Sequence, residues 1–141
     1  MRVMVIVKAS KESEAGILPP TELFEKMGKY NEELVKAGIM LAADGLQPTS
    51  KGKRVKFSGE RPTVIDGPFS ETKELIAGYW LWQVRSMEEA VEWLKRAPFG
   101  GGAEVEIRPV FETSDLGVTF TPELKERDRR LREQIAAKKV S

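Results

Sequence analysis

The sequence predicts an α+β fold built from two similar strand–helix–strand halves and followed by a separate C-terminal helix. Segments with the alternating apolar pattern of strands flank two segments with helical spacing, and the composition becomes densely charged after residue 121. With 141 residues, 40% of them hydrophobic, the chain suits one domain with a single core. We therefore expect a globular domain over residues 1–112 and a charged helical extension over residues 113–141.

The first half is predicted to contain a strand, a helix and a hairpin. Residues 2–8 are apolar on both alternating faces, which indicates a buried, central strand. A helix is expected to start at Thr21 and to end at Gly38, with one apolar stripe facing the core. Residues 53–57 and 61–65 alternate around a polar turn and predict a β-hairpin. The expected helical stripe consists of Phe24, Met27, Tyr30, Leu34 and Val35.

The second half is predicted to have a strand, a helix and a final strand, in that order. Residues 76–84 form an aromatic strand containing Tyr79, Trp80 and Trp82, whose bulk we expect two helices alone not to cover. Ser86 begins the next helix through a capping box, in which Ser86 accepts the amide of Glu89 and Glu89 accepts the amide of Ser86. A last strand over residues 103–110 completes a ferredoxin-like βαββαβ order with the hairpin inserted between the halves.

An open sheet covered by helices on one side leaves its other face to a partner. The aromatic strand adds to the apolar surface that needs covering. We therefore expect a homodimer, in which a second subunit covers what the helices leave open.

The composition excludes many kinds of chemistry. The chain has no cysteine and no histidine, so thiol nucleophiles, disulfides, Ser-His-Asp triads and metal sites built on thiolate or imidazole are ruled out. Carboxylates, lysine and tyrosine remain for proton transfer. We expect no metal and no cofactor. The net charge of +1 calls for no nucleic-acid partner.

Neither end of the sequence suggests a membrane segment. The longest apolar run near the start, residues 3–7, is far shorter than the roughly 20 residues that span a bilayer. A soluble, cytoplasmic protein is expected. The C-terminal helix should start at Thr121 and carry the ion pairs Glu123–Arg127, Glu126–Arg130 and Asp128–Arg132. Its narrow apolar stripe suits a helix that either lies along a partner or is partly mobile.

Residues 66–74 (DGPFSETKE) combine a turn signal with four charged side chains just before the aromatic strand. A rigid scaffold presents polar sites on such segments. If Asp66 is partly buried, its pKa rises and it can act as a general acid or base, while Lys73 stabilises an anionic substrate. These two residues are the candidate catalytic pair. The alternative is purely structural: Asp66 fixes the turn, and Phe69 fills the core.

Four further residues are candidate ligand contacts. Glu71 and Glu74 can tune Lys73, Tyr79 can donate a hydrogen bond, and Arg108 can contact an anion through two parallel hydrogen bonds. The expected ligand is a small polar or anionic molecule.

Four motifs give the chain its resemblance to the YCII-related superfamily, and specifically to its DGPF-motif branch. They are residues 45–48 (GLQP), 66–74 (DGPFSETKE), 78–80 (GYW) and 104–110 (EVEIRPV). The resemblance implies a ferredoxin-like fold that dimerises into an α+β barrel with a cleft near the subunit junction. It implies little about activity, because DGPF proteins are largely uncharacterised. The wider group includes enzymes thought to use a His-Asp pair, a mechanism that this histidine-free chain cannot adopt.

Three classes of function stay open at this point. The first is a homodimeric small-molecule-binding protein with a polar cleft around Asp66 and Lys73. The second is a cofactor-free, histidine-independent enzyme for proton transfer, elimination or isomerisation, which needs both residues in one enclosed pocket. The third is a regulatory or interaction module, suggested by the charged helix and by the DGPF domains that accompany sigma-factor regions.

Overall fold

The computed structural model describes residues 1–70 and 74–140, the last two by their backbone alone. The chain divides into two compact units, Met1–Val110 and Phe111–Ser141. The first unit contains all the strands of the described residues, and the second contains the long C-terminal helix.

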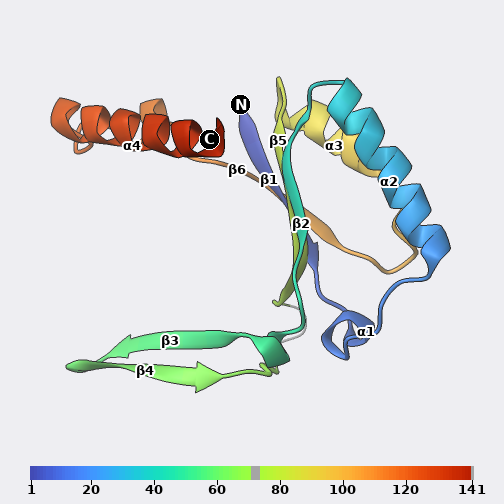
Figure 1. Ribbon diagram of the computed structural model, residues 1–141. Coiled ribbons are helices and arrows are strands. Elements are labelled where there is room, and N and C mark those ends of the chain that lie inside the picture. The colour runs from blue at the N-terminus through green and yellow to red at the C-terminus, as the bar shows by residue number, and fades with distance from the viewer. Residues whose placement is uncertain (71–73, 141) are drawn as a thin grey trace. The chain divides into compact units, whose positions relative to one another are not determined.

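A four-stranded antiparallel sheet forms the centre of the first unit (Figure 1). Its strands are β1 (Arg2–Lys8), β2 (Met40–Gly45), β5 (Ile76–Gln83) and β6 (Val105–Pro109), in the order β2-β5-β1-β6. This is the strand order of a ferredoxin-like fold, so the predicted fold class is confirmed. Strand β1 is central, as its apolar sequence on both faces predicts.

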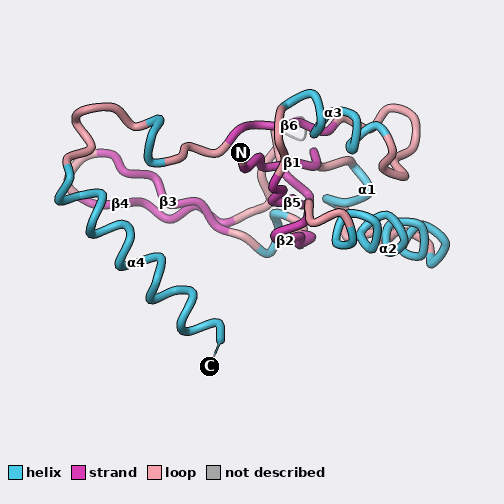
Figure 2. Tube along the Cα trace, turned by 90° about the horizontal axis from the view of Figure 1, so that it is seen from above, coloured by secondary structure: helices cyan, strands magenta, loops and turns pink. Residues whose placement is uncertain are grey.

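Helices α2 (Thr21–Lys36) and α3 (Met87–Lys95) both lie on one side of this sheet (Figures 1 and 2). Val3, Val5, Trp80 and Trp82 point from the sheet into the core, where Leu34 of α2 is fully buried. The long side chains of α2 and the aromatic strand therefore meet in one apolar layer.

Two expectations about this core are wrong. Trp80 and Trp82 are only 5% and 0% exposed, so these two need no second subunit to cover them, while Tyr79 on the other face of the sheet is half-buried. Phe24 and Val35 remain 57% and 59% exposed, because the buried stripe of α2 is narrower than the apolar pattern suggests. Its fully buried members are Tyr30 and Leu34.

Polar side chains fasten α2 to its neighbours. The Tyr30 hydroxyl donates to the backbone carbonyl of Trp93 in α3 over 2.6 Å, and burial raises the pKa of Tyr30 to about 12. The Trp80 indole donates to the Asn31 side chain over 2.9 Å. Each buried polar group of these pairs thus has a partner, as burial requires.

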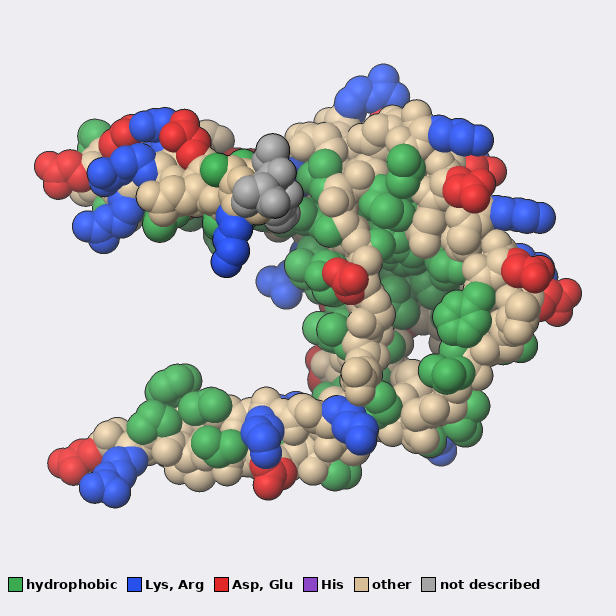
Figure 3. Space-filling view, viewed as in Figure 1, with side chains coloured by type: hydrophobic (Ala, Val, Ile, Leu, Met, Phe, Trp, Pro, Cys, Tyr) green, Lys and Arg blue, Asp and Glu red, His purple; other side chains and the backbone are tan. Residues whose placement is uncertain are grey.

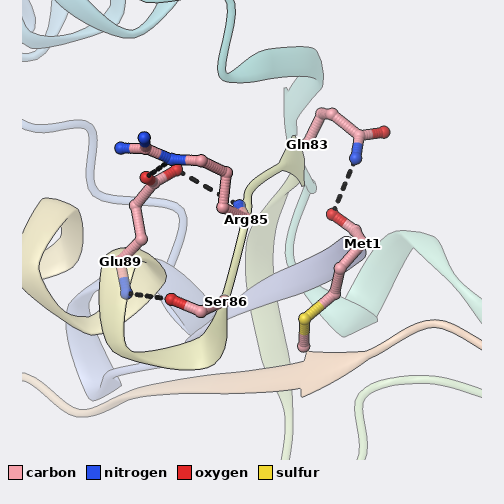
Figure 4. A network of polar contacts seen from close by, with 5 residues as sticks. All are labelled: Met1, Gln83, Arg85, Ser86 and Glu89. Atoms are coloured by element: carbon pink, nitrogen blue, oxygen red, sulfur yellow. Dashed lines mark hydrogen bonds and ion pairs between the residues drawn. The ribbon is translucent and has the colours of Figure 1, made fainter.

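The start of α3 shows one half of the predicted capping box (Figure 4). The Ser86 hydroxyl accepts the amide of Glu89 over 3.1 Å, as expected. The Glu89 carboxylate does not return to the amide of Ser86 and instead accepts the amide (3.3 Å) and the guanidinium Nε (2.6 Å) of Arg85. A charge-assisted bond is stronger than one to a neutral amide, and it lowers the pKa of Glu89.

The predicted hairpin is present as β3 (Lys53–Ser58) and β4 (Arg61–Asp66). Gly59 adopts a φ of 68° in the tight turn between them, a conformation that favours glycine. The two strands form a sheet of their own, and all twelve of their residues are exposed.

Three short helices lie outside the individual helices predicted from the sequence. They are α1 (Lys11–Glu14), η1 (Thr49–Lys51) and η2 (Thr113–Asp115). Ser10 and Ser13 cap α1 reciprocally through their hydroxyls, over 3.1 and 2.8 Å. One-turn helices of this kind have too few residues for an apolar period to reveal them.

Helix α4 (Pro122–Val140) makes up most of the second unit. The Thr121 hydroxyl caps it by accepting the amide of Leu124 over 3.3 Å. The predicted Asp128–Arg132 pair is confirmed at 2.8 Å, whereas Glu126 pairs with Arg129 rather than with Arg130. Among the helices of the described residues, none is both long enough and apolar enough to cross a membrane.

Candidate functional site

Hydrogen bonds to the segment around Thr49 fix the turn after β4. The amide of Phe69 donates to the Thr49 hydroxyl over 3.0 Å, and the amide of Gly67 donates to the carbonyl of Gly52 over 3.0 Å. The Glu14 carboxylate then accepts both the hydroxyl (2.6 Å) and the amide (3.1 Å) of Thr49. The DGPF segment is therefore tied to η1 and, through Glu14, to α1.

Glycine and phenylalanine each have a packing reason in this turn. A Cβ on Gly67 would lie 1.7 Å from the carbonyl oxygen of Thr49, so only glycine allows this approach of the two backbones. The guanidinium of Arg54 lies 3.8 Å from the centre of the Phe69 ring in a cation–π contact. Phe69 is half-buried beneath Arg54 and does not fill the core, contrary to the structural alternative.

Asp66 lies at the end of the exposed hairpin. Its side chain is 75% exposed and forms an ion pair with Lys53 on the neighbouring strand, with 2.5 Å between Oδ1 and Nζ. The burial on which an acid–base role of Asp66 depends is therefore absent. Glu71 and Lys73, two of its predicted partners, lie outside the described residues.

Tyr79 and Arg108 lie on the face of the four-stranded sheet opposite α2 and α3. Strand register aligns four side chains in one row across this face: Asp44, Tyr79, Ile6 and Glu106. Arg108 lies in the neighbouring row, opposite Met4.

Each of the two predicted residues on this face has a carboxylate partner. The Tyr79 hydroxyl donates to Asp44 over 2.9 Å, and this hydrogen bond raises the pKa of Tyr79. The Glu106 carboxylate forms two ion pairs, with 3.6 Å from its Oε2 to Nε of Arg108 and 3.3 Å from its Oε1 to Nζ of Lys8. The sequence missed both carboxylates, because their partners become visible only when the strands are paired in register.

A polar hollow opens where β1 ends and β5 begins. It has a volume of about 640 Å³, and Glu74, one of the predicted ligand contacts, lines it. Lys8, Ser10, Ser13 and Glu104 are the other polar residues that line it. Among the described residues that line it, two carboxylates accompany one lysine, and that lysine is already paired with Glu106.

A second, more apolar hollow of about 340 Å³ adjoins the first. Pro19, Met27 and Ala43 line it, and Tyr79 borders it although its hydroxyl is bonded to Asp44 on the other face of the sheet. Figure 3 shows hydrophobic side chains gathered in the depression between β2 and α2. Both hollows are lined by Val7, Ala77 and Phe99, so we treat them as the polar lobe and the apolar lobe of one cleft.

The cleft uses residues that the sequence does not single out. Ser10 and Ser13 belong to a segment for which the sequence predicts no helix, and only their i, i+3 spacing indicates the reciprocal cap that they form. The described lining offers hydrogen-bonding groups beside apolar walls, which is the make-up of a ligand pocket.

A ferredoxin-like α+β domain with a cleft at one end of its sheet is thus the class of protein that the fold and this site define. The profile of the YCII-related domain matches residues 1–114. The chain is also similar to an uncharacterized protein of Rhizobium meliloti (strain 1021), with 30% identity over 111 residues, which cover 76% of this chain and 85% of the relative. The chain belongs to the YCII-related family.

Proposed function

We propose that this protein is a homodimeric small-molecule-binding domain whose ligand occupies the two-lobed cleft. The observation that carries the proposal is the pairing of a polar lobe and an apolar lobe around Val7, Ala77 and Phe99. Lobes of about 640 and 340 Å³ fall in the size range of small-molecule sites, roughly 300–1,000 Å³.

The lining favours a ligand with a polar end and an apolar body. Glu74, Glu104 and the two serines can accept or donate hydrogen bonds in the polar lobe, while Met27 and Trp80 offer apolar surface in the other. The described carboxylates outnumber the lysine, so a neutral or cationic polar group suits this lobe better than an anion. Glu74 is a ligand contact that the sequence and the cleft have in common, whereas the Tyr79 hydroxyl is bonded to Asp44 on the other face of the sheet.

Asp66 and Lys73 remain the reactive pair suggested by the sequence alone. The exposed ion pair between Asp66 and Lys53 gives no support to proton transfer by Asp66, since an exposed carboxylate keeps its solvation. Binding is therefore the function that we propose ahead of catalysis.

The dimer would form through the face of the sheet opposite α2 and α3. Met4 and Leu41 on this side are 36% and 50% exposed, and Leu81 is half-buried. In an antiparallel sheet with helices on one side, the other face commonly contacts either water or a partner. Exposed apolar side chains on that face favour the partner.

Mass spectrometry of small molecules released from gently purified protein tests the binding proposal. We expect wild type to release one defined compound in near-equimolar amount. Ala77→Phe should lose at least about nine-tenths of it, because Ala77 lines both lobes and the larger ring would occupy the space. Ala136→Phe makes the same change at an exposed position of α4 and should retain the compound.

Two results would count against the proposal. One is equal retention by Ala77→Phe and wild type while both remain folded by circular dichroism. The other is a wild type that releases nothing even when it is purified from its own source.

A further inference from the structure

One face of the β3–β4 hairpin is a continuous apolar strip. Strand register places Val55 opposite Val64 and Phe57 opposite Pro62, and alternation along the strands puts all four side chains on the same face. We call these four residues the hairpin strip. Val55, Phe57 and Val64 are 50%, 82% and 59% exposed, and Figure 3 shows hydrophobic side chains along one side of this hairpin.

The strip carries no net charge, whereas the opposite face is basic. The charged residues at its inner end, Lys53 and Asp66, neutralise each other over 2.5 Å. The other face carries Arg54, Lys56 and Arg61. Two copies of the basic face would repel one another, but two copies of the strip can approach without opposing like charges.

A two-stranded hairpin on its own is marginally stable in water. It gains stability when a further apolar layer covers one face. Strands β3 and β4 pair only with each other in the described structure, and none of their residues is buried. The strip is therefore the part of the hairpin that most requires a partner.

We propose that the hairpin strip packs against a second copy of this chain and forms part of the homodimer interface. The neutral strip is compatible with a two-fold axis, at which the same surfaces of both copies meet reciprocally. The strip has four uncharged apolar side chains, and the nearby Lys53 and Asp66 neutralise each other. It therefore has no group that would select an acidic or a basic partner.

The size of the strip shows that it extends an interface rather than forming one alone. A hairpin of six-residue strands is about 20 Å long and about 10 Å wide, so one face projects onto about 200 Å². A stable dimer buries about 800 Å² on each partner. Most of the interface must therefore come from another surface, and the open face of the four-stranded sheet is the surface already proposed for the homodimer, on which this inference rests.

Sedimentation equilibrium of Phe57→Asp tests the inference, with Ser58→Asp as the matched control. Both variants add one negative charge at adjacent hairpin positions, but Phe57 belongs to the strip and Ser58 to the opposite face. We expect the dimer dissociation constant to rise at least about 30-fold for Phe57→Asp, as for a central interface side chain. Ser58→Asp should stay within about threefold of wild type.

Hydrogen exchange of the hairpin amides supplies a second readout that does not depend on a variant. The amides of residues 54–65 should exchange more slowly in the wild-type dimer than after dilution to monomer. The inference is overturned if Phe57→Asp dimerises as tightly as wild type, if dimerisation leaves hairpin exchange unchanged, or if wild type is monomeric. The first two results leave the sheet-face dimer standing, and none of the three alters the test of ligand binding in the cleft.

Discussion

At the scale of single residues, the hydrogen bonds of Thr49 fix the DGPF turn in place. Its hydroxyl accepts a bond from the amide of Phe69 and donates one to Glu14, whose carboxylate also accepts the Thr49 amide. The conspicuous charge of the motif, Asp66, instead points to solvent and to Lys53. The turn formed by Gly67 and Phe69 is therefore held by neighbouring segments, and Asp66 takes no part in the hydrogen bonds that hold it.

Thr49→Val should loosen this turn while keeping the side-chain shape. Loss of two side-chain hydrogen bonds at a partly buried position should cost about 1–3 kcal/mol locally. The measurement is amide hydrogen exchange of Phe69, which we expect to accelerate at least about fivefold. Thr63→Val, on the exposed hairpin, is the control and should leave Phe69 unchanged. Unaltered protection of Phe69 in Thr49→Val would show that Thr49 does not hold the turn.

The sequence predicts an element well when the signal for it is local. The hairpin, the Ser86 cap and the central position of β1 follow from turn residues, capping geometry and apolar pattern, and all are present. The bond between Glu14 and Thr49 joins residues 35 positions apart, so no local pattern reveals it. For the same reason, the solvent exposure of Asp66 could not be foreseen: it depends on how the hairpin packs, which is a tertiary property.

The cleft shows the same limit. Glu74, expected as a ligand contact, lines the polar lobe, whereas the hydroxyl of Tyr79, the expected donor, is bonded to Asp44 on the other face of the sheet. Its shared wall is made by Val7, Ala77 and Phe99, which come from the end of β1, the start of β5 and the loop after α3. Apolar residues at such positions look like ordinary core in a sequence, and only the fold shows that they border a hollow.

Helices α2 and α3 are coupled by the Tyr30 hydroxyl, and the coupling should depend on pH. Folding raises the pKa of Tyr30 from 10.0 to about 12, so the unfolded chain releases this proton first as pH rises. The hydroxyl's contribution is therefore complete below pH 10 and is lost as pH rises through about 12.

Tyr30→Phe removes both the hydrogen bond and the ionisation. At pH 8 the variant should be less stable than wild type by about 1 kcal/mol in urea unfolding. Between pH 10 and about 12 that difference should shrink, since only wild type has a hydroxyl to ionise at residue 30. Comparing the two proteins at each pH cancels the titration of their common lysines. A difference that stays constant up to pH 12 would contradict the raised pKa.

At the scale of the whole molecule, the YCII-related domain has a buried apolar core and, on its surface, exposed apolar side chains on the open sheet face and on the hairpin. Trp80 and Trp82 of the aromatic strand are buried within the chain, so the case for a dimer shifts from that strand to the open sheet face and to the hairpin strip. The cleft lies at one end of the sheet and is lined within a single chain. Ligand binding and dimerisation are thus separate claims that separate experiments can test.

The measurement that tests the central claim most directly is an amide NMR titration of the ¹⁵N-labelled protein with the compound released from it. If the two-lobed cleft is the binding site, the largest shift changes should fall on Val7, Ala77 and Phe99 and on the residues of both lobes around them, while Lys53 and Asp66 stay unchanged. Shift changes centred on Asp66 and the base of the hairpin, with the cleft unaffected, would contradict the account and return the site to the charged turn.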